Sequence, residues 1–203
     1  MRRALKDDGE LRRKMISSQR SSLTLNPMFR FLQLFARLCL FRGQAADVPR
    51  SEALLVITGA VAVISNAVNA VPNMGLFGGA FLSVGQVLLF SAFIYLILRF
   101  RGRQERAIQT LTAMFGASSI LQIIALPFFG WHERLLPDDP EAAMMLTTPL
   151  IVAAIIAVWS LAVMTSILRQ AMETGTGAAL LMIVGCQSLV MFIIMSLSSN
   201  PTG

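Results

Sequence analysis

The side chains that could do chemistry are few in this 203-residue sequence, and most of them are amides embedded in apolar stretches. The set consists of Asn66, Asn69, Gln86, Gln122 and Gln187. Amides inside a membrane hydrogen-bond across helices, for about 1 kcal/mol or less each, or they line a route for a polar solute. The apolar stretches that carry them hold no Asp, Glu, Lys, Arg or His, so they offer no ionisable group for a proton relay.

No catalytic constellation and no metal or cofactor motif occurs in the sequence. The single histidine, His132, stands beside Glu133, and one histidine with scattered carboxylates is too small a ligand set for zinc. Cys39 and Cys186 form no CxxC motif, and we expect both to be small buried side chains. Phosphate-binding, dinucleotide, zinc-protease and nucleophile-elbow motifs are missing as well. We therefore expect no enzyme activity, no metal and no cofactor.

Five uncharged stretches are each long enough to cross a bilayer as a helix. Because every backbone N–H must be satisfied internally in lipid, a span takes about 20 apolar residues. The stretches are 53–71, 76–98, 107–129, 148–168 and 178–197. Prolines, glycines or arginine-rich segments separate them, with the first break at Pro72-Asn73 and an outer loop at 131–143. The sequence thus predicts an all-α polytopic membrane bundle of five transmembrane helices, within residues 53–200.

Basic residues gather on one side of this topology. With the N-terminus inside, the inner segments 1–52, 99–106 and 169–177 hold every Lys and Arg except Arg134. This distribution follows the positive-inside rule, so we expect a cytoplasmic N-terminus and a C-terminus on the far side. Because the positive charges lie on one side of the spans, we interpret the formal net charge of +6 as a surface for anionic lipid headgroups and not for nucleic acid.

The residues before the first span divide into two parts. Residues 1–25 are charged and then serine-rich, a composition typical of a mobile segment. Residues 26–52 begin with Asn26-Pro27, which predicts a helix start, and Arg30, Gln33 and Arg37 then recur along one side of an apolar helix. Such an amphipathic helix is expected in the cytoplasmic interface or, alternatively, packed under the bundle.

Two further groups of residues predict contacts. Gly75, Gly79 and Ser83 are spaced four apart and place small residues on one helix face, which is typical of close helix packing. Arginines at the inner edge are expected to contact anionic lipid or a partner protein. They are Arg30, Arg37, Arg42, Arg99, Arg101, Arg103 and Arg106.

Short segments spread over the chain carry a resemblance to a known family. They are LFRG at 40–43, DVP at 47–49, RFRGR at 99–103, AIQTLTA at 107–113 and WSLAV at 159–163. Over roughly residues 28–200 the chain resembles the Yip family of Ypt/Rab-interacting membrane proteins, in its bacterial branch. The resemblance implies a five-helix bundle in a bacterial inner membrane, with a periplasmic C-terminus.

Eukaryotic members are associated with small GTPases and vesicle traffic, whereas bacterial relatives generally lack an assigned function. The long acidic N-terminal region of the eukaryotic members is replaced here by a short basic one, so the resemblance does not extend to GTPase binding.

Two functions are consistent with these patterns. The first is a non-enzymatic scaffold, accessory subunit or assembly factor that acts through helix packing and a basic cytoplasmic edge, with a membrane-protein partner or further copies of itself. The alternative is a small permease or channel subunit with an amide-lined route. The two differ in whether the five amides converge on one water-accessible cavity.

Overall fold

The computed structural model describes residues 27–135 and 147–198. The segment 1–25, which we expected to be mobile, and the acidic stretch 136–146 lie outside the described residues. Within the described residues every regular element is helical and no strand occurs.

Five helices are long and apolar enough to cross a membrane. They are Glu52–Ala70, Gly75–Phe100, Gln104–Leu135, Thr148–Met172 and Thr176–Ser196. Each overlaps one of the five predicted stretches, which confirms the all-α bundle with five helices of spanning length. The composition and length of these helices are compatible with an integral membrane protein.

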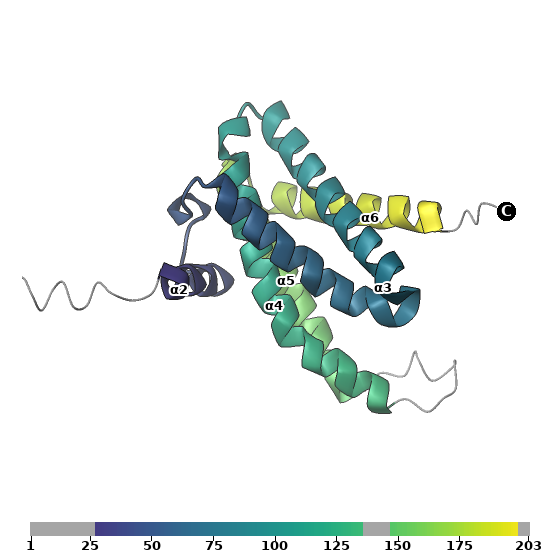
Figure 1. The fold of residues 1–203 in the computed structure, drawn as a ribbon. Coiled ribbons are helices and arrows are strands. Elements are labelled where there is room, and N and C mark those ends of the chain that lie inside the picture. The colour runs from purple at the N-terminus through teal and green to yellow at the C-terminus, as the bar shows by residue number, and fades with distance from the viewer. Residues whose placement is uncertain (1–26, 136–146, 199–203) are drawn as a thin grey trace, which may run out of the picture. The chain divides into compact units, whose positions relative to one another are not determined.

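The first two of these helices are the two limbs of α3 (Glu52–Phe100), which turns back on itself at Gly75 (Figure 1). The helix starts where the Ser51 hydroxyl accepts a hydrogen bond from the Leu54 amide at 3.3 Å. Gly75 has φ 71° and ψ 171°, a backbone region that is essentially restricted to glycine. The break therefore falls at Gly75, whereas the sequence placed it at Pro72-Asn73.

Helix α4 (Ala107–Leu135) lies at the centre of the helix packing. In its apolar stretch of 18 residues, half are buried inside the protein, against 17 to 28% in the corresponding stretches of the other four helices. Its buried stretch is rich in small residues such as Ala113, Gly116 and Ala117, which let neighbouring helices approach closely. The outer faces of the other helices expose large apolar side chains such as Phe81 and Ile155, as a bundle surrounded by lipid requires.

The far end of α4 differs from the sequence prediction. We expected the helix to stop near Phe129 and Trp131 to lie in an outer loop, but α4 continues to Leu135. It passes through Pro127, which removes one backbone donor without ending the helix, as is common in membrane helices. His132 is buried on this last part of α4, and its Nδ1 lies 2.6 Å from the hydroxyl of Thr147, the residue before α5 (Thr148–Met172).

Helix α2 (Pro27–Cys39) begins at the predicted proline, and Asn26 lies outside the described residues. The chain divides into the units Met1–Gln33 and Leu34–Gly203, so only the end of α2 belongs to the second unit. In that unit Cys39 is buried, and its thiol donates to the carbonyl of Ala117 at 3.5 Å. The Trp159 indole N–H of α5 donates to the Cys39 carbonyl at 2.9 Å.

The contacts at the end of α2 and just after it lie along the sides of α4 and α5. The ring of Phe35 packs against Gly116, and Phe41 meets the ring of Trp159 edge-on at 5.4 Å. Gly116 is about ten residues from the start of α4, or roughly 15 Å along the helix. These contacts describe only the part of the chain after Gln33, so both predicted placements of the amphipathic helix, in the interface or packed under the bundle, stay predictions.

Candidate functional site

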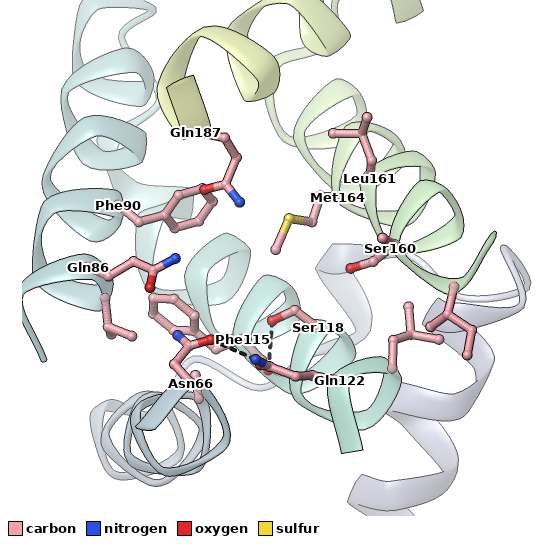
Figure 2. A pocket seen from close by; sticks show the side chains of 15 residues that line it. Asn66, Gln86, Phe90, Phe115, Ser118, Gln122, Ser160, Leu161, Met164 and Gln187 are labelled. Atoms are coloured by element: carbon pink, nitrogen blue, oxygen red, sulfur yellow. Dashed lines mark hydrogen bonds between the residues drawn. The ribbon is translucent and has the colours of Figure 1, made fainter. Parts of the chain in front are cut away.

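Four of the five predicted amides, from four different spans, line one cavity of about 330 Å³. Asn66 stands on the first limb of α3 and Gln86 on the second. Gln122 stands on α4, and Gln187 on α6 (Thr176–Ser198). Figure 2 shows these side chains arranged around a common space between the helices. The structure therefore brings together residues that the sequence could select only by type.

The cavity adjoins a second space of about 600 Å³. The same four amides line both, and Asn69, Ser83 and Ser188 are added in the second. All five predicted amides therefore line one pair of adjoining cavities.

The five amides divide by the hydrogen bonds that they make. The Gln122 amide N–H donates to the Asn66 side-chain oxygen at 2.8 Å, which joins α4 to the first limb of α3. Asn69 donates to the carbonyl of Ser65, one turn earlier in its own helix, at 3.2 Å. Gln86 and Gln187 make no hydrogen bond with any residue that the structure describes. Both side chains line the cavity, Gln86 half-buried and Gln187 exposed, so their donors and acceptors are accessible to water or a ligand.

The remaining lining combines hydroxyls with apolar rings. Ser118 donates to the carbonyl of Phe115 at 3.2 Å, and Ser160 adds a second hydroxyl from α5. Phe90 and Phe115 pack against each other at 6.1 Å between ring centres and form one wall. The sequence offered no signal for these two rings, because an aromatic residue in a span is indistinguishable from an ordinary packing residue.

The lining of the amide cavity carries no charged side chain. Among the described residues no group of three or more His, Cys, Asp or Glu side chains could hold a metal ion. The arrangement can donate and accept hydrogen bonds in an apolar surrounding, and it presents neither a general base nor a nucleophile. Its chemistry suits recognition of an uncharged polar molecule.

The small residues of the second limb of α3 have two different uses. Ser83 is buried and donates to the carbonyl of Gly79 at 2.7 Å, on the packed side of the limb. Gly75 forms the turn, and nothing lies within 4 Å of the position that a Cβ would take there. Within the chain, the need for glycine at residue 75 comes from its backbone conformation, and the predicted packing of Gly75 against a partner helix stays a prediction.

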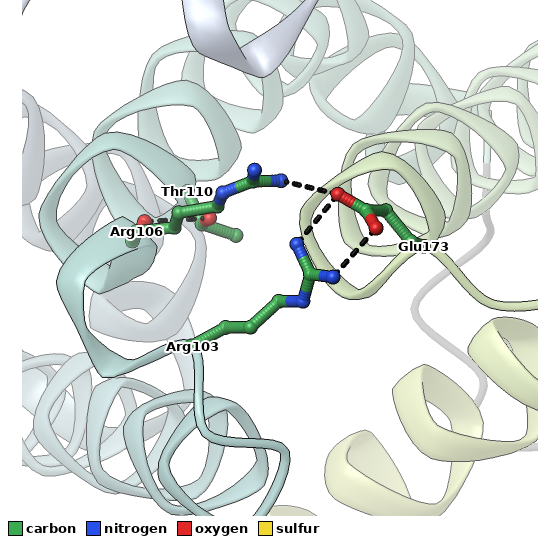
Figure 3. Close-up of polar contacts among 4 residues, drawn as sticks. All are labelled: Arg103, Arg106, Thr110 and Glu173. Carbon is green, nitrogen blue, oxygen red and sulfur yellow. Dashed lines mark hydrogen bonds and ion pairs between the residues drawn. The ribbon is translucent and has the colours of Figure 1, made fainter.

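The predicted basic edge contains an ion-pair cluster that the sequence did not reveal. Both terminal nitrogens of Arg103 bind the Glu173 carboxylate at 2.5 Å, and Arg106 binds it at 3.1 Å (Figure 3). Glu173 follows α5 in a left-handed conformation, and the two arginines precede α4, so the cluster ties two loops together. The other arginines predicted at this edge within the second unit are exposed: Arg37, Arg42, Arg99 and Arg101. Arg30, also exposed, belongs to the first unit.

Glu173→Gln should lower the melting temperature at neutral pH and have less effect in acid. Hydrogen bonds from Arg103 above all, together with the charges of Arg103 and Arg106, hold the pKa of Glu173 below its ordinary value of 4.5. The carboxylate thus stabilises the fold fully above pH 4.5, and this contribution is lost as the pH falls through the lowered pKa. Melting curves of both proteins between pH 7 and pH 3 should show the difference in their melting temperatures shrinking as the pH falls.

Glu105→Gln is the matched control, because Glu105 is exposed in the loop that carries Arg103 and Arg106 and makes no ion pair with a described residue. It should leave the pH dependence unchanged. A Glu173→Gln protein whose melting temperature runs parallel to that of the wild type at every pH would contradict the cluster.

Comparison with known proteins adds no relative: no protein-family model, curated protein or solved structure matches this chain. The fold and the cavity thus define a class only, an all-helical bundle of five spanning-length helices around a neutral polar cavity.

Proposed function

We propose that the chain is a small permease or channel subunit that accepts an uncharged polar solute in the amide-lined cavity. The observation that carries this proposal is the pair Gln86 and Gln187, which face the same cavity without a hydrogen-bond partner among the described residues. Interhelical packing alone accounts for Asn66 and Gln122, which bind each other. It does not account for Gln86, which is half-buried, and Gln187, which is exposed, because an amide without a hydrogen-bond partner is costly at membrane depth unless it meets water or a solute.

The nature of the solute follows from the lining. A charged solute would lose its hydration without meeting an opposite charge, at a high cost in free energy. A volume of about 330 Å³ equals that of roughly ten water molecules. We therefore propose a small polyol or amide, with hydroxyl or N–H groups that match the glutamine side chains and with carbon atoms that pack against Phe90 and Phe115.

Cysteine labelling tests whether the cavity is open to water. In a chain with Cys39→Ala and Cys186→Ala, cysteines placed at Gln86 and Gln187 should react with a polar, membrane-impermeant thiol reagent. Leu88→Cys is the matched control, because Leu88 lies on the same limb as Gln86 but is 63% exposed on an apolar face. It should stay unlabelled in a bilayer. If the two cavity positions react no faster than Leu88→Cys, the permease proposal fails.

Solute entry is measured on the full chain in liposomes by osmotic swelling with glycerol or urea. The double variant Gln86→Leu and Gln187→Leu should abolish the protein-dependent part of the swelling rate. Gln104→Leu makes the same chemical change on an exposed loop outside the cavity and should not alter it. Equal swelling of protein-free and protein-containing liposomes for both solutes would contradict the proposed solute class.

A non-enzymatic scaffold or assembly factor is the second candidate, and the exposed arginines Arg42, Arg99 and Arg101 favour it. They supply a basic edge for anionic headgroups or for a membrane-protein partner, which includes a second copy of the chain. Capture from native membranes in mild detergent should then recover a partner in stoichiometric amount. Recovery of the chain alone and as a monomer would dismiss this candidate.

The setting that we propose is a bacterial inner membrane, with the N-terminus cytoplasmic and the C-terminus periplasmic. The clustering of Arg99 to Arg106, Arg169 and Glu173 at one end of the helices supports this direction. The resemblance to the Yip family is proposed for the helical bundle only. An alkaline phosphatase fusion should be active at the C-terminus and inactive after Gly102; the opposite pattern would reverse the topology.

A further inference from the structure

A separate polar cavity, of about 620 Å³, lies at the end of the bundle that carries the arginines. It is formed by the short helix η1 (Ala45–Asp47), the beginning of α4 and the end of α5. It shares no residue with the amide-lined cavity, so it is a separate site. Arg50 and Arg106 contribute its positive charges and Glu173 its negative charge.

The walls of this cavity are held by hydrogen bonds between distant parts of the chain. The Ala45 amide donates to the Gln170 side-chain oxygen at 3.2 Å. The Gln109 side chain donates to the Val48 carbonyl at 2.9 Å. Val48 is fully buried, so η1 and the residue after it are anchored on both α4 and α5. The cavity is therefore a built feature of the fold and not a gap beside a loose loop.

The charges around the cavity leave an excess of positive charge. Glu173 is bound by both Arg103 and Arg106, so its negative charge is already compensated. Arg50 lines the same cavity and makes no ion pair or hydrogen bond with a described residue. The nearby carboxylate of Asp47 accepts from the Gln44 amide at 2.9 Å and does not line the cavity. The Arg50 guanidinium is thus available to an anion.

We propose that this cavity binds a phosphate ester that carries hydroxyl groups. Guanidinium groups bind phosphate oxygens with two parallel N–H donors, and Arg50 can do so while Arg106 adds charge. The side-chain amide of Gln44, which lines the cavity, suits the hydroxyls of a glycerol-type group, whereas the Gln170 amide and the Thr110 hydroxyl are already bound within the protein. The cavity stands where α4 and α5 meet the basic loops, at the level expected for lipid headgroups. A phosphatidylglycerol headgroup and a free glycerol phosphate share this chemistry.

The test measures binding of phosphatidylglycerol to the full chain in detergent, by native mass spectrometry and by the shift in melting temperature. Phosphatidylcholine at the same mole fraction is the neutral-headgroup comparison. Wild type should bind phosphatidylglycerol in preference, and Arg50→Gln should weaken this binding about tenfold, as loss of a charged hydrogen bond predicts. Arg169→Gln removes an arginine that is also exposed at this end of the bundle but does not line the cavity, and it should leave the affinity within about twofold.

The remaining outcomes separate the sources and the alternatives. If glycerol 3-phosphate alone raises the melting temperature of wild type but not of Arg50→Gln, a free phosphate ester suffices; if only the lipid does so, the acyl chains contribute. Equal losses in Arg50→Gln and Arg169→Gln would mean general attraction by surface charge and would overturn the site. Equal binding of the two lipids would overturn it as well. These readouts do not involve the amide-lined cavity, so they stand or fall independently of the permease proposal.

Discussion

Gly116→Leu should detach the segment around Phe35 from α4 and reduce the free energy of unfolding by about 1 to 3 kcal/mol. The reason is steric. A Cβ atom built at Gly116 would lie 2.3 Å from the ring of Phe35, a distance at which the ring must move. Because the ring is buried and the helix around Gly116 is at the centre of the bundle, the segment and not α4 should give way.

Two measurements detect the detachment directly. With Cys186→Ala, Cys39 is the only thiol, and its burial should protect it from maleimide in the wild type and expose it in the variant. With Trp131→Phe, the emission of Trp159 should shift to longer wavelength, because its N–H loses the Cys39 carbonyl and its ring loses Phe41.

Gly130→Leu is the control, since it lies on the same helix and nothing stands within 4 Å of its added Cβ. It should leave both the labelling and the emission unchanged. Equal protection of Cys39 in the wild type and in Gly116→Leu would show that Phe35 does not sit on Gly116.

Gly75→Ala should reduce the free energy of unfolding by about 1 to 3 kcal/mol, through the backbone alone. At φ 71° and ψ 171° an alanine is strained, although no neighbouring atom lies within 4 Å of the added methyl group. The change in the free energy of unfolding therefore reports the backbone strain at the turn between the two limbs of α3 and not the packing of the limbs. Unfolding in mixed micelles of increasing denaturing detergent gives the difference between the variant and the wild type.

Gly85→Ala provides the matched comparison on the second limb. Its surroundings are equally open, but its backbone is helical, so alanine should leave stability unchanged or raise it by up to about 1 kcal/mol. Destabilisation of the same size in both variants would rule out a glycine-specific turn at residue 75.

How far the sequence could predict the site is clear from the amides themselves. The sequence identifies these residues by their amide side chains and by their position inside the spans, and the structure places all of them on two adjoining cavities: Asn66, Asn69, Gln86, Gln122 and Gln187. The sequence could not separate Asn69, which is satisfied within its own helix, from Gln86, which is not. That distinction depends on how each helix is rotated about its axis, and the spacing of residues along one helix does not report it.

The charged residues also divide into features that the sequence could predict and features that it could not. The sequence selected the arginines of segment 99–106, but it did not pair two of them with Glu173, about seventy residues away, or single out Arg50. Both depend on which loops meet at the end of the bundle. A pairing between distant loops is decided by the packing of the helices that they connect.

The sequence by itself determined the five spans, because the thickness of a bilayer and the need to satisfy every backbone N–H within the helix are demands on consecutive residues. It did not determine where the limbs of α3 part or where α4 ends, since a proline in a span is tolerated when neighbouring helices support it. Only the tertiary structure decided that four amides from four spans face one cavity, that Phe35 sits on Gly116, and that Arg50 is left available beside an ion-paired cluster. Each of these depends on the relative rotation and depth of helices far apart in the chain, which only their mutual packing sets.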